Sequence, residues 1–483
     1  MRLATVLAAA LLVTGCGGDG ERAAGGGAGG STLRSTLVDP DGDGVLARGP
    51  GEPLRDRTEL APASRPGRAI ATFGQLTDTH VRDEESPGRV PFLDRYGGAL
   101  NPTFRPQEAL SPQVLAAAVR ALRAERPAAV VVTGDIVDNA QRDELAQARA
   151  VLDGGLVRPD TGAPGYRGVQ QASNPDPLYY RPDLDAPRHP GLLAAAQRPF
   201  RSPGLGVPWL PVVGNHDAAR QGYVAASART DAIATGTRLT TTLDPEFRPP
   251  APEDVQAGLD ELLDAGVPGR AMTVPADPGR AALRPEELVA ALGRGRRLRA
   301  PDRLDYVFDL GPRVRGIVLD TVARGASGSG GEILPKQVAW LREQLAAAGE
   351  RDVVVFSHNR LDSVERGGAA AVAALDASGA VVANVAGDVH RNRIRPRRTP
   401  AGGYWVIETS SLADFPMQAR MLRLRETAGG GRVLETWMVD QDGRGLAGPA
   451  RELAYLDSQG GRPRGFAGGR GDRNVRLFLA PRR

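Results

Sequence analysis

Short apolar runs that end in polar residues recur five times along this chain, and this pattern constrains its fold more than any other feature. Each run has the length and composition of a buried strand. Four of the five histidines stand just beyond such a run. The runs and their endings are Ala69–Leu76 with Asp78 and His80, Ala128–Thr133 with Gly134 and Asp135, Trp209–Val213 with Gly214 to Asp217, Asp352–Phe356 with Ser357 and His358, and Val381–Ala386 with Gly387 to His390. Open α/β sheets bind ligands at the carboxyl ends of their strands, so we expect these ends to converge on one crevice.

The remaining patterns complete an α/β core over residues 68–440. Further strands are predicted at Asp305–Asp309, Arg315–Asp320, Tyr404–Glu408, Met421–Arg425 and Val433–Val439. Helical periodicity predicts helices at Pro112–Glu125, Asp143–Leu152, Pro335–Ala348 and Gly368–Leu375. Residues 153–205 and 218–304 break the rhythm and are interpreted as insertions, which are typical sources of substrate specificity. Residues 441–483, rich in Arg and Gly, are expected to form a poorly packed C-terminal extension.

Composition excludes several classes of protein. Lys+Arg 61 against Asp+Glu 57 leaves a net charge of only +4, too weak a surplus for a dedicated nucleic-acid binder. One cysteine excludes an internal disulfide framework and any cysteine-built zinc site. The hydrophobic fraction of 41% is too high for a disordered chain.

The N-terminal pattern predicts an export signal. Met1 and Arg2 precede an apolar run over residues 3–13, which is too short to span a bilayer, and the run ends near Cys16. Residues 1–16 resemble a bacterial lipoprotein signal peptide, which implies that Cys16 is acylated and anchors the protein at the outer side of the membrane or in the cell envelope. The alternative is an ordinary cleaved signal with an incidental cysteine. Residues 17–67 are interpreted as a Gly-rich tether followed by an irregular segment.

The residue types at the strand ends indicate a metal site. A single Asp-x-His or Gly-Asp after a strand is more often a turn or a helix cap, but five such ends in one chain favour a common function. Side chains two apart on a strand point the same way, so Asp78 with His80, and Asp388 with His390, are each expected to serve one ion. Imidazole, carboxylate and amide ligands suit Mn, Fe, Zn or Co, and the lack of thiolates argues against copper(I) and iron–sulfur centres.

The order Asp-x-His, Gly-Asp, Gly-Asn-His-Asp, a strand-borne His and Gly-x-x-His resembles the calcineurin-like metallophosphoesterases. The match covers residues 69–440, with long gaps, and is most specific at Gly214–Asp217. It implies an α/β sandwich of two mixed sheets flanked by helices, with two divalent metal ions. By resemblance, one ion is held by Asp78, His80 and His390, a second by Asn215, His358 and Asp388, and both by Asp135. His216 would protonate the leaving group, braced by Asp217.

The chain departs from the family at one ligand. The last motif is usually Gly-His-x-His, whereas here it is Gly387–His390 with Asp388 in place of an imidazole. A carboxylate hardens the second position and favours Mn or Mg there, or leaves it loosely occupied. Purple acid phosphatases carry a metal-binding Tyr three residues after the bridging Asp; Asp138 stands there, which argues against an iron–tyrosinate centre.

Two further stretches bear on the substrate. Arg391 and Asn392 directly follow His390 and are candidate phosphate-binding residues, although the Arg-rich run over residues 391–398 also fits a solvated loop. Residues 410–420 resemble a segment of a bacterial subgroup of the family and are candidates for lining the pocket.

These patterns predict an exported phosphoesterase that hydrolyses phosphomonoesters or phosphodiesters by metal-activated hydroxide. Two alternatives stay open. The first is a catalytically impaired lipoprotein that only binds a phosphorylated ligand, because Asp388 weakens the second metal. The second is a structural envelope protein with a vestigial site. The substrate, the identity of the metal and the oligomeric state are not encoded in any pattern that the sequence shows.

Overall fold

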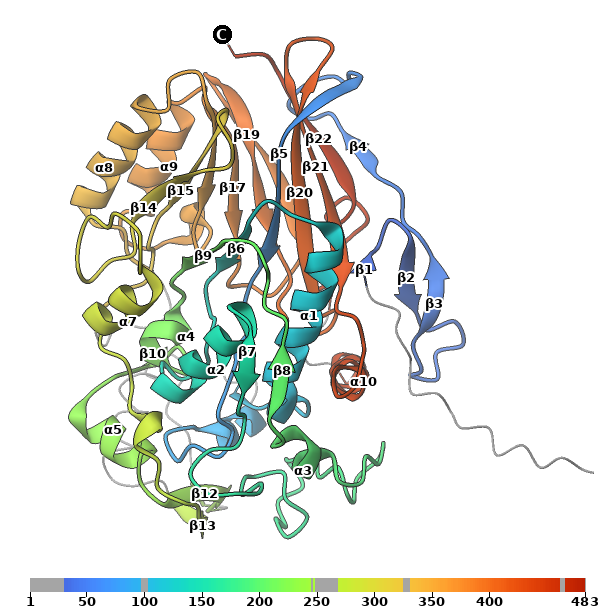
Figure 1. The fold of residues 1–483 in the computed structure, drawn as a ribbon, viewed down its shortest axis with the longest axis vertical. Coiled ribbons are helices and arrows are strands. Elements are labelled where there is room, and N and C mark those ends of the chain that lie inside the picture. The colour runs from blue at the N-terminus through green and yellow to red at the C-terminus, as the bar shows by residue number, and fades with distance from the viewer. Residues whose placement is uncertain are drawn as a thin grey trace, which may run out of the picture.

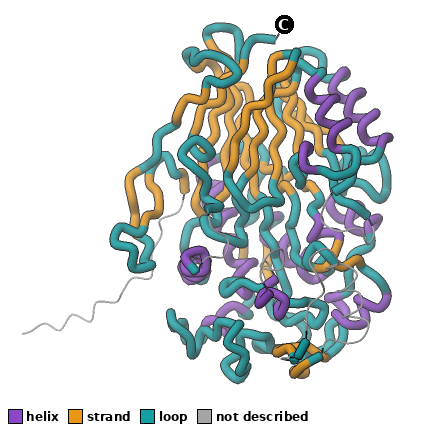
Figure 2. The backbone as a smooth tube through the Cα atoms, turned by 180° about the vertical axis from the view of Figure 1, so that it is seen from behind, coloured by secondary structure: helices purple, strands orange, loops and turns teal. Residues whose placement is uncertain are grey.

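Two β-sheets lie face to face in one half of the molecule, and helices cover their outer faces (Figure 1). The computed structural model describes residues 30–96, 103–244, 246–247, 268–324, 331–460 and 465–482. The predicted fold class, an α/β sandwich with helical and loop insertions, is therefore confirmed. Figure 2 shows the strands gathered in one half of the molecule and the loop-rich insertions in the other.

The first sheet has eight strands in the order β4-β22-β21-β20-β5-β6-β9, with β1 paired to β21. Its strands are β1 (Gly30–Ser31), β4 (Arg55–Arg57), β5 (Pro66–Leu76), β6 (Val130–Thr133), β9 (Trp209–Val212), β20 (Gln418–Thr427), β21 (Arg432–Asp440) and β22 (Val475–Leu479). β5, β6 and β9 are parallel neighbours, so their carboxyl ends lie at one edge of the sheet.

The second sheet has six strands in the order β14-β15-β16-β17-β19-β18. They are β14 (Tyr306–Asp309), β15 (Val314–Val318), β16 (Asp352–Phe356), β17 (Val381–Ala386), β18 (Arg393–Thr399) and β19 (Gly402–Glu408). β16 and β17 are parallel, and every residue of both strands is buried. Continuous apolar runs such as Val353–Phe356 suit this position because a central parallel strand is covered on both faces.

Helices and a shared apolar core hold the layers together. α1 (Ser111–Glu125) contacts β20 and β21 of the first sheet. α8 (Pro335–Ala346) and α9 (Gly368–Asp376) pack on the outer face of the second sheet in a cluster of their own. Between the sheets, the rings of Phe73 and Phe356 meet edge to face at 5.8 Å between centroids.

The described parts of the interpreted insertions contain short elements. Residues 153–205 include β7 (Gly155–Val157), α3 (Leu192–Ala196) and β8 (Phe200–Ser202). Residues 218–304 include β10 (Ala219–Arg220), β11 (Val224–Ala225), α5 (Ala228–Ala234), β12 (Arg238–Leu243), β13 (Gly269–Thr273) and α7 (Pro285–Leu292). Other helical elements are α2 (Arg142–Leu152), α4 (Asn215–Ala218), α10 (Ala447–Gln459) and the 3-10 turns Pro91–Tyr96, Glu108–Leu110, Pro278–Arg280 and Leu361–Ser363.

Three segments differ from the expectations drawn from sequence. The C-terminal extension is packed, not loose: α10 has buried Leu453, and β22 pairs with β21 inside the first sheet. Residues 30–67 carry strands as well as loops, including the hairpin of β2 (Ser35–Val38) and β3 (Ala47–Pro50). Most of the Arg-rich run after His390 is the edge strand β18. β22 pairs with the distant strands β21 and β4, whereas β2 and β18 each pair with the next strand in the chain. Local charge counts do not reveal either kind of pairing.

The predicted signal peptide, Cys16 and the first part of the predicted tether lie outside the described residues. In the described part of the chain, no helix has the length and apolar character needed to cross a membrane.

Candidate metal centre

Four of the five predicted strand ends line one cavity of about 280 Å³. The fifth, at His358, is buried against Asn215 and Asp135, which do line the cavity. β5, β6 and β9 of the first sheet deliver their ends from one side, and β16 and β17 of the second sheet deliver theirs from the other. The cavity is lined by His80, Arg82, Arg105, Asp135, Asn215, His216, Tyr223, Asp388, Val389, His390, Ala413, Asp414 and Phe466. Candidate ligands from both sheets therefore face a common space.

A first group of possible ligands joins Asp78, His80, Asp135 and His390. Each of them offers one atom, and these atoms all lie within 4.8 Å of one another. The Nε2 atoms of His80 and His390 are 3.1 Å apart, and His390 Nε2 is 3.5 Å from Asp78 Oδ1. Three of the four side chains are buried, and His390 is half-buried.

The hydrogen bonds of the two imidazoles show why this group suits a cation. His80 Nδ1 lies 2.9 Å from Asp138 Oδ1, and His390 Nδ1 contacts Asp414 Oδ2. In each ring Nδ1–H is the donor to a carboxylate, so Nε2 carries the lone pair. The two Nε2 lone pairs face one another and Asp78. Carboxylate partners of this kind orient metal-ligating histidines. The donor set fits a divalent ion of the Mn, Fe, Zn or Co type.

A second group of possible ligands surrounds His358. Its Nδ1 bonds to the backbone oxygen of Thr133 at 2.9 Å, and because that oxygen only accepts, Nδ1 is the donor. Its Nε2 lies 3.0 Å from Asn215 Oδ1, 3.4 Å from Asp135 Oδ2 and 3.5 Å from Asp388 Oδ1. All three neighbours are acceptors, so a cation at their centre would satisfy the whole set.

Asp135 belongs to both groups. Its Oδ2 is 3.7 Å from His80 Nε2 and 3.4 Å from His358 Nε2, while Oδ1 accepts the backbone N–H of His216 at 2.9 Å. Burial raises the pKa of this carboxyl, but the charges of His358 and His216 outweigh burial and hold the pKa well below its ordinary value. Asp135 is therefore an anion positioned between the two groups.

The residues that meet here are those whose order along the chain resembles the motifs of the calcineurin-like metallophosphoesterases.

Comparisons with known proteins add the following. A scan against protein-family models matches none, and a search of curated proteins also matches none. Solved structures similar to the chain include a dimetal phosphatase from Danio rerio, with 15% identity and a TM-score of 0.42 over 77% of this chain and 97% of that chain. Another is the sulfate thiohydrolase SoxB from Thermus thermophilus, with 14% identity and a TM-score of 0.31 over 82% of this chain and 61% of that chain.

The side chain of His216 stands beside the two groups, but its partner differs from the expected one. His216 Nδ1 lies 3.1 Å from the backbone oxygen of Asp138 and 3.2 Å from its Oδ1. Asp217 instead accepts backbone N–H groups from Gly214 at 2.8 Å and Val137 at 3.0 Å, which fixes the turn after β9. The prediction that Asp217 braces His216 was wrong because its short side chain caps its own helical turn.

Strained backbone is concentrated at this site. Among the described residues, nine non-glycine positions have positive φ, and five of them are possible ligands: Asp78, His80, Asp135, Asp388 and His390. Left-handed backbone is costly for such residues and is typical of functional sites. It also ends the alternation of a strand, so Asp388 turns toward His358 while His390 turns toward His80. The expectation that Asp388 and His390 serve one ion was therefore wrong.

The two residues predicted to bind phosphate do not line the cavity. Asn392 is buried, and its side chain accepts from Ser410 N at 3.0 Å and from Arg420 Nη2 at 2.9 Å. Arg391 is exposed and lies over the ring of Phe466, 5.7 Å from its centroid. Both were misassigned because the chain turns outward immediately after His390 and pairs with residues 466–467.

Residues other than Arg391 and Asn392 line the cavity. Arg82 and Arg105 line the cavity and are almost fully buried, each paired to a carboxylate. Two aromatic side chains also line the cavity: Tyr223 from the β10–β11 turn and Phe466 from the C-terminal segment. Of the predicted segment 410–420, Ala413 and Asp414 reach this cavity. Ala413, Asp414 and Asp138 carried a sequence signal, since all three lie within stretches already singled out.

Proposed function

We propose that this protein is a metal-dependent phosphoesterase that hydrolyses phosphomonoesters or phosphodiesters. The observation that carries the proposal is Asp135, an anion shared by two groups of ligand atoms, beside a histidine whose ring is held by Asp138. Two divalent ions, when bound by these groups, would polarise the phosphoryl oxygens and lower the pKa of water so that it attacks at neutral pH.

The chain's own residues supply the remaining parts of the chemistry. Asp138 contacts the Nδ1 side of His216, which leaves Nε2 as the atom that exchanges a proton with the leaving group. Burial lowers the pKa of His216, but Asp135 and Asp138 more than reverse this and raise the pKa above its ordinary value. A raised pKa favours the protonated imidazole, which is the form that an acid catalyst needs.

Arg82 and Arg105 place two guanidinium groups in the wall of the cavity, each ion-paired with a carboxylate. Arg82 donates to Glu108 and Asp138, and Arg105 donates to Asp414. Because these partners fix both guanidinium groups, neither has to be ordered when substrate enters. This arrangement supports binding of a charged phosphate ester in preference to an uncharged ester.

The test combines metal analysis with hydrolysis, using the full-length chain. Elemental analysis counts bound metal, and p-nitrophenyl phosphate and bis(p-nitrophenyl) phosphate report turnover with added Mn, Zn or Mg. We expect two ions per chain and turnover of at least one ester. Asp135→Asn is expected to abolish turnover and reduce bound metal, whereas Asp309→Asn, an exposed carboxylate on β14, leaves both unchanged.

One specific observation bears on the binding-protein alternative. Asp388 stands where the family has an imidazole, yet its Oδ1 reaches within 3.5 Å of His358 Nε2. If Asp388→His raises metal stoichiometry and creates turnover that the natural chain lacks, the protein is a phosphate-ligand binder. Turnover by the natural chain with two ions excludes that alternative.

The location of the enzyme is part of the proposal. We place it outside the cytoplasm, held to the membrane by acyl chains on Cys16, on the basis of the N-terminal sequence alone. Cys16→Ser is expected to move the protein from the membrane fraction to the soluble fraction of exporting cells, as measured by fractionation. Unchanged retention in the membrane would contradict the lipid anchor.

A further inference from the structure

A second and larger cavity, of about 470 Å³, lies between the β2–β3 hairpin and the first sheet. It shares no lining residue with the cavity of the candidate metal centre. Thin walls separate the two: Asp414 lines the first cavity and Phe415 the second, and Phe466 and Ala467 are divided in the same way. The volume falls within the range of small-molecule sites, roughly 300–1,000 Å³.

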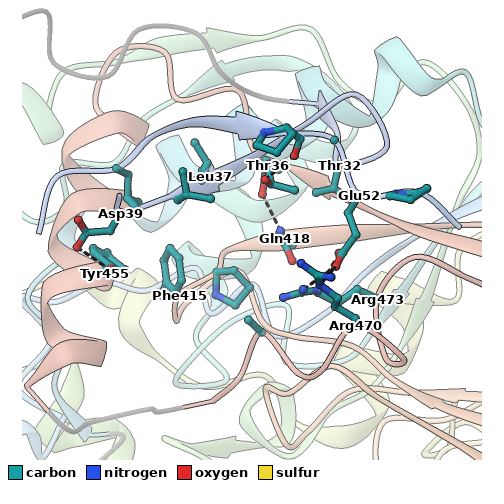
Figure 3. A pocket seen from close by; sticks show the side chains of 18 of the residues that line it. Thr32, Thr36, Leu37, Asp39, Glu52, Phe415, Gln418, Tyr455, Arg470 and Arg473 are labelled. Carbon is teal, nitrogen blue, oxygen red and sulfur yellow. Dashed lines mark hydrogen bonds and ion pairs between the residues drawn. The ribbon is translucent and has the colours of Figure 1, made fainter. Parts of the chain in front are cut away.

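One end of this second cavity is apolar and aromatic. Leu37 from β2, Phe415 and Tyr455 from α10 face one another there (Figure 3). The rings of Phe415 and Tyr455 are 4.9 Å apart, and the Tyr455 hydroxyl donates to Asp39 at 3.0 Å. Asp39 also accepts two backbone N–H groups, so its carboxylate is satisfied within the protein.

The middle of the cavity holds an unsatisfied acceptor. Gln418 is 8% exposed, and its side-chain nitrogen donates to Asp440 at 2.7 Å. Its Oε1 is buried and has no hydrogen-bond partner among the described residues. A buried acceptor without a donor is destabilising. A ligand hydroxyl that reaches Gln418 would recover that loss.

The opposite end carries more arginine than carboxylate. Arg473 pairs with both oxygens of Glu52, at 2.8 and 2.9 Å, so that this carboxylate is already neutralised (Figure 3). Arg470 approaches Glu52 only at 3.6 Å, and its side chain is 75% exposed. Arg55 also lines the cavity. Two guanidinium groups therefore remain available to a ligand anion, and a guanidinium offers five N–H donors in a fixed fork.

We propose that this cavity is a second binding site, which holds a small organic anion bearing hydroxyl groups. The anionic group lies at Arg470 and Arg55, a hydroxyl donates to Gln418 Oε1, and the carbon skeleton packs on Phe415 and Tyr455. The proposal does not depend on the phosphoesterase activity, because none of these residues belongs to the candidate metal centre.

Calorimetry on the full-length chain tests the proposal. Metal is stripped with a chelator, and the chelator is then removed by dialysis, so that turnover does not consume the probe. The probes are glucose 6-phosphate, gluconate, glucose and inorganic phosphate. We expect saturable binding of at least one of the first two, about tenfold or more tighter than binding of glucose or inorganic phosphate, since a hydrogen bond to a charged group contributes roughly 1.5–3 kcal/mol. The relative affinities of glucose 6-phosphate and gluconate then show whether the site prefers a phosphate or a carboxylate.

Variants locate the bound probe. Arg470→Gln is expected to weaken binding about tenfold, and Gln418→Met, which keeps the side-chain length, about fivefold. Arg65→Gln, an exposed arginine outside the cavity, and Asp135→Asn, at the metal centre, are expected to leave binding unchanged. Arg470 is mostly exposed, so its replacement does not threaten folding. Absence of saturable binding by every probe overturns the proposal, and so does binding that survives Arg470→Gln but is lost in Asp135→Asn.

Discussion

His216 is the residue on which the chemistry of this site depends most directly. Its ring is held at Nδ1 by Asp138, and its side chain is 14% exposed at the cavity. We expect His216→Ala to retain metal but to lower kcat by roughly 100-fold or more for alkyl phosphates, since general acid catalysis contributes about 10²–10⁴-fold. For p-nitrophenyl phosphate, whose leaving group needs no proton, the loss is expected to be much smaller.

Steady-state kinetics on the two ester types, with elemental analysis of the variant, measures this prediction. His189→Ala is the matched control, because His189 lies outside the cavity, near Glu452. Equal loss for both esters would show that His216 does not act as an acid.

The site residues that could be predicted from sequence are those that follow a strand directly. Asp78, Asp135 and His358 follow strands directly, and the structure brings them together. The partners of these residues were harder to assign: Asp217 was chosen for His216 because it is next in sequence, whereas the structure uses Asp138 from the end of another strand. Asn392 was misassigned for a related reason, since its partner Arg420 lies 28 residues away.

At the scale of elements, the turn between β10 and β11 sets the shape of the second ligand group. Gly222 has φ of +74°, and a Cβ there would lie 2.3 Å from Asn215 Nδ2 and 2.7 Å from His216 Nε2. We expect Gly222→Ala to displace both side chains and to weaken binding of the second metal by about 10- to 100-fold, as losses around metal ligands do. Metal titration followed by calorimetry measures the effect.

Gly295→Ala is a control matched in backbone for this turn. Gly295 has φ of +77°, and nothing lies within 4 Å of the position that a Cβ would take there. The same left-handed strain is therefore present without the contact. Equal metal affinity in the two variants would mean that the turn does not shape the site.

A buried carboxyl where β14 begins makes stability depend on pH. Burial and the neighbouring Asp320 raise the pKa of Asp305 to about 7. The unfolded value is about 3.9, so between about pH 4 and 7 the folded state binds more protons, and stability falls as pH rises through this window. We expect Asp305→Asn, which keeps an oxygen acceptor for Asp320 N and Gln337, to raise Tm at pH 8, by the equivalent of up to about 4 kcal/mol.

Thermal unfolding at pH 4 and pH 8 checks this sign. At pH 4 the natural carboxyl is protonated in the folded state, so the advantage of the variant is expected to shrink toward zero. A gain of the same size at both pH values would show that charge at this position is not the cause.

Elements were predictable from sequence when their pattern was strong. The bounds of β16 and β17 are those expected, because runs such as Val353–Phe356 are continuous and apolar. β18 was missed because an edge strand tolerates charge, and its arginines pair with Asp376 and Glu408 of neighbouring elements. β22 was missed because its alternating apolar residues lie inside an Arg-rich tail.

At the scale of the whole molecule, the candidate metal centre joins the two sheets. Asp78, His80 and Asp135 follow strands of the first sheet, whereas His358 and His390 follow strands of the second. The carboxylates of Asp78 and Asp135 are buried, with ligand atoms within 4.8 Å of each other. Asp388 adds a third carboxylate, 3.5 Å from His358. A cation would therefore both offset repulsion among the carboxylates and tie the sheets together at one edge. This long-range arrangement needs the order of strands in both sheets, which the sequence pattern alone did not specify.

Metal binding is accordingly expected to stabilise the entire sandwich. A ligand that binds only the folded state at 100 times its Kd contributes about 2.7 kcal/mol, so added Mn or Zn should raise Tm by several degrees and a chelator should reverse the rise. Differential scanning calorimetry of the natural chain and of Asp135→Asn measures the effect. Asp135 links the two ligand groups, so its variant should lose most of the metal-dependent shift. A Tm shift of equal size in both proteins would mean that the stabilising ion binds elsewhere. The stability of the fold would then not depend on metal at the strand ends that form the candidate site.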